Sequence, residues 1–142
     1  MGITTSAMNE LRSHLAFTQM RFHCSKQQTR TFHVATVVNS TGEAVVQFFS
    51  GQTDELPLSC NSFQRMDDDN SKLATQCYKW GNDGSLYVGK WGNHHFLGED
   101  RMYIFPALVP GLYHWKIESP WLCDDRFDTT LLPGNFWKIF VR

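Results

Sequence analysis

The chain lacks an excess of charge of either sign. Its 142 residues include 13 Lys and Arg against 14 Asp and Glu, a formal net charge of -1 at pH 7, and the basic residues are scattered. Without a basic face, nucleic acid is not an expected partner. Long apolar runs are missing too, because Ala44 to Val46 and Phe48 to Phe49 fall far short of the roughly 20 residues that span a bilayer. We therefore expect no membrane insertion.

Motifs of common enzyme classes are also absent. The sequence contains no Gly-x-Ser-x-Gly, no His-Glu-x-x-His and no Gly-rich phosphate loop, so we expect a protein that is not an enzyme. One enzymatic alternative stays open. A glycoside hydrolase needs only two carboxylates, which Glu99 or Glu118 could supply with Asp124 or Asp125, at a separation that the sequence does not give.

Short Cys-x-x-Cys pairs of the kind that bind zinc are missing as well. Four widely spaced cysteines are present instead and favour disulfide bonds: Cys24, Cys60, Cys77 and Cys123. Three intrachain pairings and an interchain bridge remain open. Asn39-Ser40-Thr41 is an N-glycosylation sequon in an expected loop. Together these features predict a secreted, extracellular protein. Residues 1–10 lack the regions of a signal peptide, as expected for a mature chain behind an added Met.

Apolar residues follow a period of two in most of the chain, which predicts an all-β fold with small α content: a compact, antiparallel, sandwich-like domain with long ligand-binding loops. Phe32–Val38 and Ala44–Phe49 are expected to form a hairpin around a turn at 39–43. Asp83-Gly84 favours a second, tight hairpin turn between Tyr78–Trp80 and Leu86–Val88.

The remaining elements are expected from shorter patterns. The further strands are Leu15–Phe22, Leu73–Trp80, Arg101–Phe105, Leu112–Ile117 and a closing core strand at Phe136–Val141, which puts Trp137, Ile139 and Val141 on one face. A short helix is expected at Ser6–Ser13, with Ser6 as its N-cap. We therefore divide the chain into an N-terminal arm or short helix at 1–13 and a single β-rich domain at 14–142, for which the loop residues below predict carbohydrate binding.

Oxygen-bearing side chains gather in expected loops. Calcium takes six to eight oxygen ligands, which converging loops can supply. The candidate ligands are Asn93, Glu99, Asp100, Asp124 and Asp125. The competing interpretation is that these residues only shape turns. Zinc is a weaker candidate, because adjacent His94 and His95 would point to opposite faces of a strand.

Aromatic residues make up 14% of the chain, which includes five Trp. Most are expected in the core, but Trp91 between two glycines and Trp121 after Pro120 are candidates for exposed platforms that stack on a sugar ring. His94, His95 and Arg101 would hydrogen-bond sugar hydroxyls. Arg101 is also explained by a salt bridge with the neighbouring acids.

The segments GKWGNHHFLGEDRMYIFPA, SPWLCDD and PGNFWKIFVR resemble secreted cnidarian proteins that include a sea-anemone lectin specific for galactose, over nearly the whole chain. The resemblance implies a calcium-bearing site that holds galactose through vicinal hydroxyls, and a disulfide-linked homodimer. Residues 66–71, Cys77 and Leu97-Gly98 are more faintly similar to fibrinogen-related domains, although the paired Trp and the later part of that fold are absent.

These observations predict a Ca²⁺-dependent lectin that binds glycans with terminal galactose and is bivalent as a homodimer. Two alternatives remain: the glycoside hydrolase described above, and an extracellular matrix protein whose acidic loops bind calcium without a sugar.

Overall fold

The computed structural model describes residues 4–26, 30–81, 87–117, 121–125 and 136–142. Three α-helices, one 3₁₀-helix and seven strands lie in this part of the chain. In chain order they are α1 (Thr5–Leu15), β1 (Met20–Lys26), β2 (Arg30–Thr36), α2 (Ser40–Phe49), β3 (Phe63–Arg65), α3 (Lys72–Thr75), the 3₁₀-helix η1 (Cys77–Lys79), β4 (Ala107–Val109), β5 (Tyr113–Lys116), β6 (Leu122–Asp125) and β7 (Phe136–Val141).

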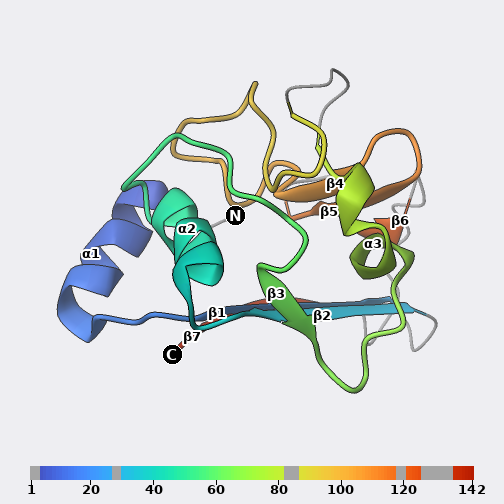
Figure 1. The fold of residues 1–142 in the computed structure, drawn as a ribbon, viewed down its shortest axis with the longest axis horizontal. Coiled ribbons are helices and arrows are strands. Elements are labelled where there is room, and N and C mark those ends of the chain that lie inside the picture. The colour runs from blue at the N-terminus through green and yellow to red at the C-terminus, as the bar shows by residue number, and fades with distance from the viewer. Residues whose placement is uncertain (1–3, 27–29, 82–86, 118–120, 126–135) are drawn as a thin grey trace.

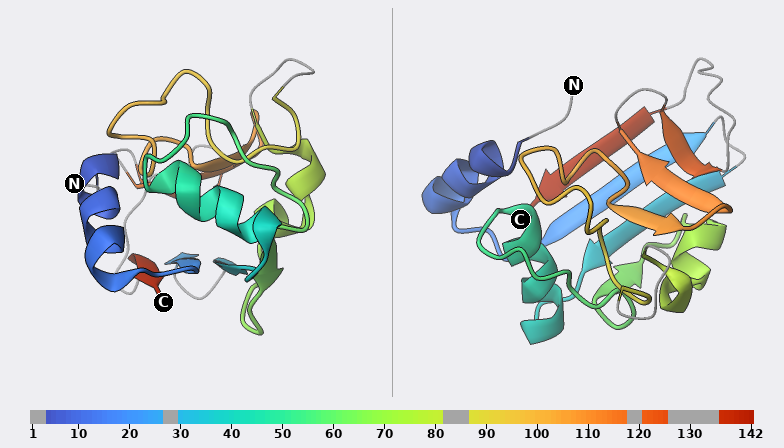
Figure 2. Two further views of the ribbon diagram at one scale, coloured as in Figure 1. Left: turned by 60° about the vertical axis from the view of Figure 1, so that its left-hand side comes forward. Right: turned by 90° about the horizontal axis from the view of Figure 1, so that it is seen from above.

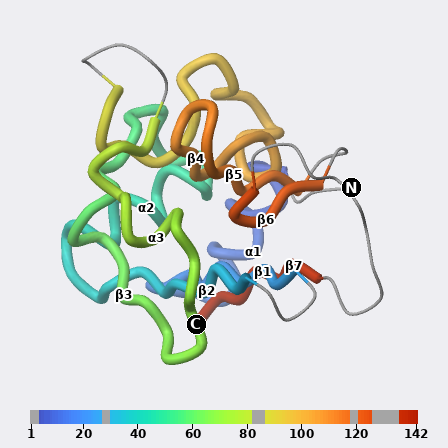
Figure 3. The backbone as a smooth tube through the Cα atoms, turned by 90° about the vertical axis from the view of Figure 1, so that its right-hand side faces the viewer, coloured from blue at the N-terminus to red at the C-terminus, as the bar shows by residue number. Residues whose placement is uncertain are grey.

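The strands form two antiparallel sheets. The larger sheet has the order β3-β2-β1-β7, and the smaller one has the order β4-β5-β6. Helices and the smaller sheet all lie on the same side of the larger sheet (Figure 1), as the end-on view also shows (Figure 3). Helix accounts for 24% and strand for 31% of the structure. The predicted compact, β-rich class with small α content is confirmed.

Alternating burial gives the larger sheet one core face and one outer face. Along β1, Phe22 and Cys24 are fully buried, whereas the residues that alternate with them, Arg21 and His23, are partly exposed. On β7, the predicted closing strand is confirmed, and its side chains Trp137 and Ile139 pack against the core. Because β7 is an edge strand of this sheet, these side chains are only half-buried.

Aromatic rings fill the space above the core face. Phe22 contacts Trp91 and Trp115 at centroid distances of 5.0 and 5.2 Å, and Trp80 meets Trp91 edge-on at 4.9 Å. Such pairs each contribute about 0.5–1.5 kcal/mol beyond the burial of their area. The core therefore joins the larger sheet to the loops and the small sheet that cover it (Figure 2).

All four cysteines form disulfide bonds, as predicted. The inter-sheet disulfide, Cys24–Cys123, joins β1 to β6, and the second bond is Cys60–Cys77. No cysteine is free, so the expectation of an interchain bridge is not met. Two disulfides indicate an oxidising, extracellular-type environment. In the part of the chain that the structure describes, no helix has the length and apolar character required to cross a membrane.

The predicted hairpin between Phe32–Val38 and Ala44–Phe49 is wrong, because the second segment belongs to helix α2. The Asn39 side chain caps this helix by accepting hydrogen bonds from the N–H groups of Thr41 and Gly42, at 2.9 and 3.1 Å. The β-branched and aromatic residues at 45–49 bury one face of the helix, and tertiary packing overrides their strand propensity.

Several shorter predictions also need correction. Leu73–Trp80 contains α3 and η1 in place of a strand, and Arg101–Phe105 is a turn. Asp83-Gly84 lies outside the described residues, although Tyr78–Trp80 before it is not a strand. Leu112–Ile117 is confirmed, since it contains β5.

The N-terminal elements are close to prediction. The expected helix at Ser6–Ser13 is confirmed but runs from Thr5 to Leu15, so it crosses the expected boundary at residue 13. Thr4, not Ser6, is its N-cap, because the Thr4 hydroxyl accepts from the Ala7 N–H at 3.1 Å. Within Leu15–Phe22, the strand starts only at Met20.

Candidate functional site

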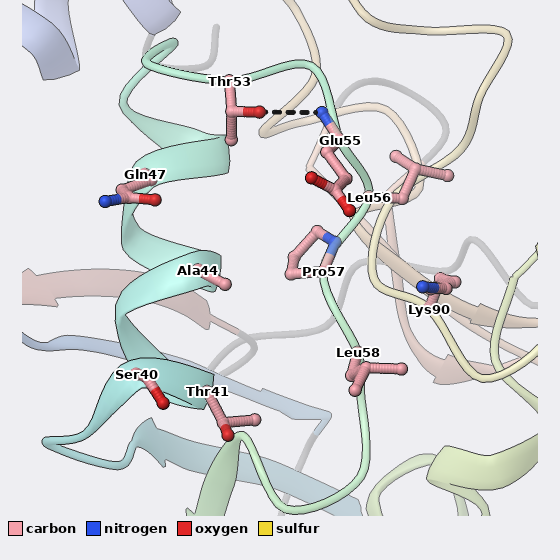
Figure 4. A pocket seen from close by; sticks show the side chains of 10 residues that line it. All are labelled: Ser40, Thr41, Ala44, Gln47, Thr53, Glu55, Leu56, Pro57, Leu58 and Lys90. Atoms are coloured by element: carbon pink, nitrogen blue, oxygen red, sulfur yellow. Dashed lines mark hydrogen bonds between the residues drawn. The ribbon is translucent and has the colours of Figure 1, made fainter.

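A pocket of about 380 Å³ lies between α2 and the segment that follows it (Figure 4). One turn after another of α2 presents a side chain to this pocket, and the extended segment 53–58 forms the opposite wall. Its lining residues are Ser40, Thr41, Ala44, Gln47, Thr53, Glu55, Leu56, Pro57, Leu58 and Lys90. The pocket therefore takes its side chains from three separate segments of the chain.

A second pocket of about 380 Å³ adjoins the first. Both are lined by Glu55, Leu56 and Lys90, so they are neighbours, and we call the two pockets together the α2 groove. The second pocket is lined further by Asp54, Tyr87, His94 and Leu97.

Backbone pairing fixes the walls of the α2 groove relative to one another. Leu58 and Lys90 form an isolated antiparallel bridge, and the Trp91 N–H donates to the Pro57 carbonyl at 2.9 Å. The buried Arg101 guanidinium donates to the carbonyl oxygens of Phe48 and Thr53 at 3.0 and 2.9 Å. Arg101 thereby ties the end of α2 to the start of the opposite wall.

The side chains of the α2 groove combine unpaired polar groups with apolar surface. Among the described residues, the side chains of Ser40, Gln47, Glu55 and Lys90 have no hydrogen-bond or salt-bridge partner. Leu58 next to them is 57% exposed. The groove can therefore offer hydroxyl, amide, carboxylate and ammonium groups to a ligand that also has an apolar face.

His94 lies in the second half of the α2 groove, stacked on Tyr87 with parallel rings 3.9 Å apart. Its Nδ1 is buried and has no partner among the described residues. A buried ring nitrogen without a partner costs free energy unless a ligand or water satisfies it. The predicted role of His94 in binding is compatible with this position. His95 is exposed, and its ring centroid lies 3.9 Å from that of His94.

The predicted aromatic platforms are not available to a ligand. Trp91 is fully buried, and its Nε1 donates to the Ser62 hydroxyl at 2.8 Å. Gly92 beside it has φ +80°, and a Cβ there would lie 3.0 Å from the Phe48 ring, so this glycine serves close packing in place of ligand approach. Trp121 is only 8% exposed. Both predictions of exposed stacking are wrong, because these rings complete the core.

Arg101 is 5% exposed and also forms an ion pair with Asp54 at 2.7 Å. The salt-bridge interpretation fits this residue, although its partner is not one of the adjacent acids. Its bonds to carbonyl oxygens assign it to holding the walls of the groove, not to contact with a sugar.

The five predicted calcium ligands do not converge in the structure. Glu99 accepts hydrogen bonds from the Ser6 hydroxyl and N–H at 2.6 and 2.9 Å, which lowers its pKa. Asn93 accepts from the His95 N–H at 2.9 Å, and the Asp100 carbonyl accepts from the N–H of Tyr103. These three residues therefore shape turns and cap α1, which was the competing interpretation.

Asp124 and Asp125 lie on β6 and are occupied by other partners. Asp124 is fully buried at φ 55° and accepts from the backbone N–H groups of Lys72 and Leu73 at 2.9 and 2.7 Å. Arg30 donates to it at 3.1 Å. Burial raises the pKa of Asp124, and these donors act in the opposite direction. Asp125 forms an ion pair with Lys26.

A different cluster lies on the outer face of the larger sheet. His23 on β1 and His33 on β2 are directly opposite each other, and their rings stack with centroids 3.6 Å apart. The Asp68 carboxylate contacts His33 Nδ1 at 2.6 Å and His23 Nε2 at 3.6 Å. Among the described residues, only this group of three or more His, Cys, Asp or Glu has its ligand atoms within 4.8 Å of one another.

The charges around this cluster shift its proton affinities. Burial, together with the neighbouring His33, lowers the pKa of His23 from 6.5 to about 4. Burial alone would raise the pKa of Asp68, but its hydrogen bond to His33 and the two imidazoles lower it.

The sequence did not indicate either arrangement. The proximity of His23 and His33 depends on the β1–β2 register, and that of Asp68 depends on the bond from the His33 N–H to Asp69, and local sequence shows neither. The polar wall of the α2 groove was hidden by the interpretation of Ala44–Phe49 as a strand. The capping pattern that begins at Asn39 could have revealed it.

No family model, curated protein or solved structure matches this chain.

Proposed function

We propose that this protein is a carbohydrate-binding domain and that the α2 groove is its sugar site. The observation that carries the proposal is the set of unpaired polar side chains along one groove: Ser40, Gln47, Glu55 and Lys90, beside the apolar Leu58. Sugars present hydroxyls that need donors and acceptors, and a C–H face that packs on apolar surface.

The binding partner is proposed to be a glycan with terminal galactose. This preference rests on the resemblance of the sequence to the cnidarian lectins, and the free polar groups of the groove are compatible with it. The two disulfides support a secreted location. Bivalence would require a homodimer held by noncovalent contacts, since all four cysteines pair within the chain.

Calcium dependence is a separate part of the proposal. Asn93, Glu99, Asp124 and Asp125 have side-chain partners, and the five predicted ligands do not converge, so calcium would have to act through other oxygens near the sugar. Glu55 and Asp54, whose carboxylate also pairs with Arg101, line the second pocket, and a Ca²⁺ ion there would hold two adjacent hydroxyls with their remaining oxygens.

The test begins with a glycan array, followed by calorimetry of the oxidised protein with the best ligand and with galactose. We expect Gln47→Ala and Glu55→Gln each to weaken binding about tenfold, the equivalent of one hydrogen bond to a charged or amide group. His94→Phe keeps the stacked ring but removes its nitrogens, so it isolates the hydrogen bond. Gln64→Ala, on an exposed residue of β3, is the matched control and should change nothing.

The outcomes separate the parts of the proposal. Absence of binding to any glycan on the array would overturn the carbohydrate-binding function. Binding to glycans without galactose would overturn the specificity alone. Affinity that is unchanged by a chelator would remove calcium. Hydrolysis of an aryl glycoside, lost in Glu55→Gln, would replace binding by catalysis, and a calcium isotherm without glycan binding would support a matrix protein.

A further inference from the structure

We infer that His23, His33 and Asp68 form a binding site for a transition-metal ion, with Zn²⁺ as the fitting ion, on the outer face of the larger sheet. This face lies away from the helices in Figure 1. The three side chains each offer one ligand atom within 4.8 Å of the others. Imidazole nitrogens and a carboxylate oxygen are the donors that zinc combines in open sites, where water takes the fourth position. The inference is independent of the α2 groove.

The sheet register holds the two histidines in place. His23 and His33 are directly paired across β1 and β2, so their backbone separation is fixed by the ladder on both sides of them. His23 is further confined by the edge of the Phe136 ring, 4.8 Å away. Two nitrogens of a paired cross-strand position can be bridged by bonds of roughly 2.0–2.1 Å to one ion.

Asp68 is positioned by its neighbour Asp69. The Asp69 carboxylate has no exposed surface and accepts from the His33 N–H at 2.7 Å, from Arg65 at 3.0 Å and from the Ser71 N–H at 3.1 Å. These bonds fasten the 66–71 loop to β2. Asp68, whose side chain is 57% exposed, is thereby held beside the histidine pair and keeps an oxygen within reach of both rings.

The stacked rings must tilt before they bind one ion. Their planes differ by only 4°, and ring lone pairs lie in the ring planes, so parallel rings cannot both point at a single metal. A modest opposite rotation of the two side chains removes this conflict. His23 has room for it, because 15% of its side chain is exposed.

Arg21 opposes metal binding and gives the inference a distinctive test. Its guanidinium lies 2.7 Å from His33 Nε2, which must accept, so Nδ1 of His33 carries the proton that faces Asp68. A metal at Nδ1 moves the ring proton to Nε2, where it confronts the Arg21 donors. The Arg21 guanidinium must then move away from His33 Nε2. Its cation–π contact with the Phe140 ring, whose centroid is 3.8 Å away, can hold it in the new position.

Lys138 on β7 is paired with His23 in the sheet and adds a second cation near the site. Both cations lower the affinity for a divalent ion. Removal of Arg21 should therefore tighten binding, the opposite of what removal of a ligand does.

The experiment is calorimetric titration of the oxidised, tag-free full chain with Zn²⁺ alone. We expect one site, weakened at least tenfold by His23→Gln and by Asp68→Asn, and tightened severalfold by Arg21→Met. The exposed neighbouring acid supplies the matched control Asp67→Asn, which should leave the affinity unchanged. The chemical shifts of the His23 and His33 imidazole protons, followed by NMR during the titration, report directly on the ligands.

The inference fails if Zn²⁺ does not bind with one-to-one stoichiometry, or if His23→Gln and Asp68→Asn bind as well as the wild type. It also fails if the shifts of His95 or His14 move in place of those of the pair. Equal or weaker binding by Arg21→Met overturns the role of Arg21 as the competing group. Circular dichroism of each variant distinguishes loss of ligands from loss of fold.

Discussion

Replacement of Asp124 by Asn tests a carboxylate that has no exposed surface. One Asp124 oxygen accepts from the Leu73 N–H, and the other accepts from both the Lys72 N–H and Arg30. In Asn, an NH₂ group replaces one oxygen, so at least one backbone donor at the start of α3 loses its partner. Asn tolerates the left-handed backbone at this position, where φ is 55°, so the change isolates the hydrogen bonds.

The expected cost follows from these contacts. A hydrogen bond to a charged group contributes about 1.5–3 kcal/mol. The neutral amide recovers part of the cost of burying a charge, which is the cause of the raised pKa of Asp124. We therefore expect Asp124→Asn to lower the free energy of unfolding by about 1–2 kcal/mol. Asp124→Ala leaves both backbone N–H groups, those of Lys72 and Leu73, without a partner and also strains the backbone. We expect it to lower the free energy of unfolding by about 3–4 kcal/mol in total.

Urea unfolding of the oxidised protein measures both variants, and a shifted midpoint at unchanged slope indicates a change in stability. The control is Asp67→Asn, an exposed acid whose replacement should change the free energy of unfolding by less than about 0.5 kcal/mol. If Asp124→Asn matches the wild type within that margin, or if Asp124→Ala is no worse than Asp124→Asn, the capping role of Asp124 is refuted.

Three further predictions concern stability. The inter-sheet disulfide closes a span of 99 residues, so replacement of both its cysteines should lower the free energy of unfolding by about 4–5 kcal/mol. Loss of Cys60–Cys77, with its span of 17, should lower it by about 3 kcal/mol. Equal losses in urea unfolding would contradict this order. Burial lowers the pKa of His114 below 6.5, so the unfolded state binds the proton more tightly and the free energy of unfolding should fall as pH drops below 6.5. His23, with its pKa lowered to about 4, contributes to the same fall, so His114→Phe should reduce the slope of that part of the profile without removing it, and an unchanged or steeper profile would argue against the role of His114. Glu99→Gln weakens the bonds to Ser6, so amide exchange in the first turn of α1 should accelerate while the inner strands keep their protection.

The β-rich class, β5, β7 and the N-terminal helix could be predicted from the sequence, because local periodicity and capping determine them. Helix α2 could not be predicted from β propensity. Its buried Val46 and Phe49 are β-branched or aromatic, which favours a strand. In the sequence, the capping residue Asn39 is the signal for a helix. In the fold, Gly42 lies so close to the Val37 carbonyl that a side chain there would not fit.

The candidate sites depended on long-range geometry. Trp91 between two glycines has the local sequence of an exposed platform, yet the empty space beside Gly92 is filled by Phe48 from α2. His23 and His33 are ten residues apart and meet only because of the β1–β2 register. Asp124 looks like a metal ligand in sequence, but the fold brings the N-terminus of α3 against it.

The cap of α2 bears on biosynthesis, because Asn39 is also the acceptor residue of the sequon. The helix uses only its Oδ1, at 2.9 Å from the Thr41 N–H, whereas an N-glycan would be attached to Nδ2. Sugar attachment and helix capping therefore make no competing demand on this side chain. A glycan attached to Asn39 would remain in place as α2 forms, and it would then stand at the N-terminal end of the helix beside Ser40 and Thr41, which line the α2 groove.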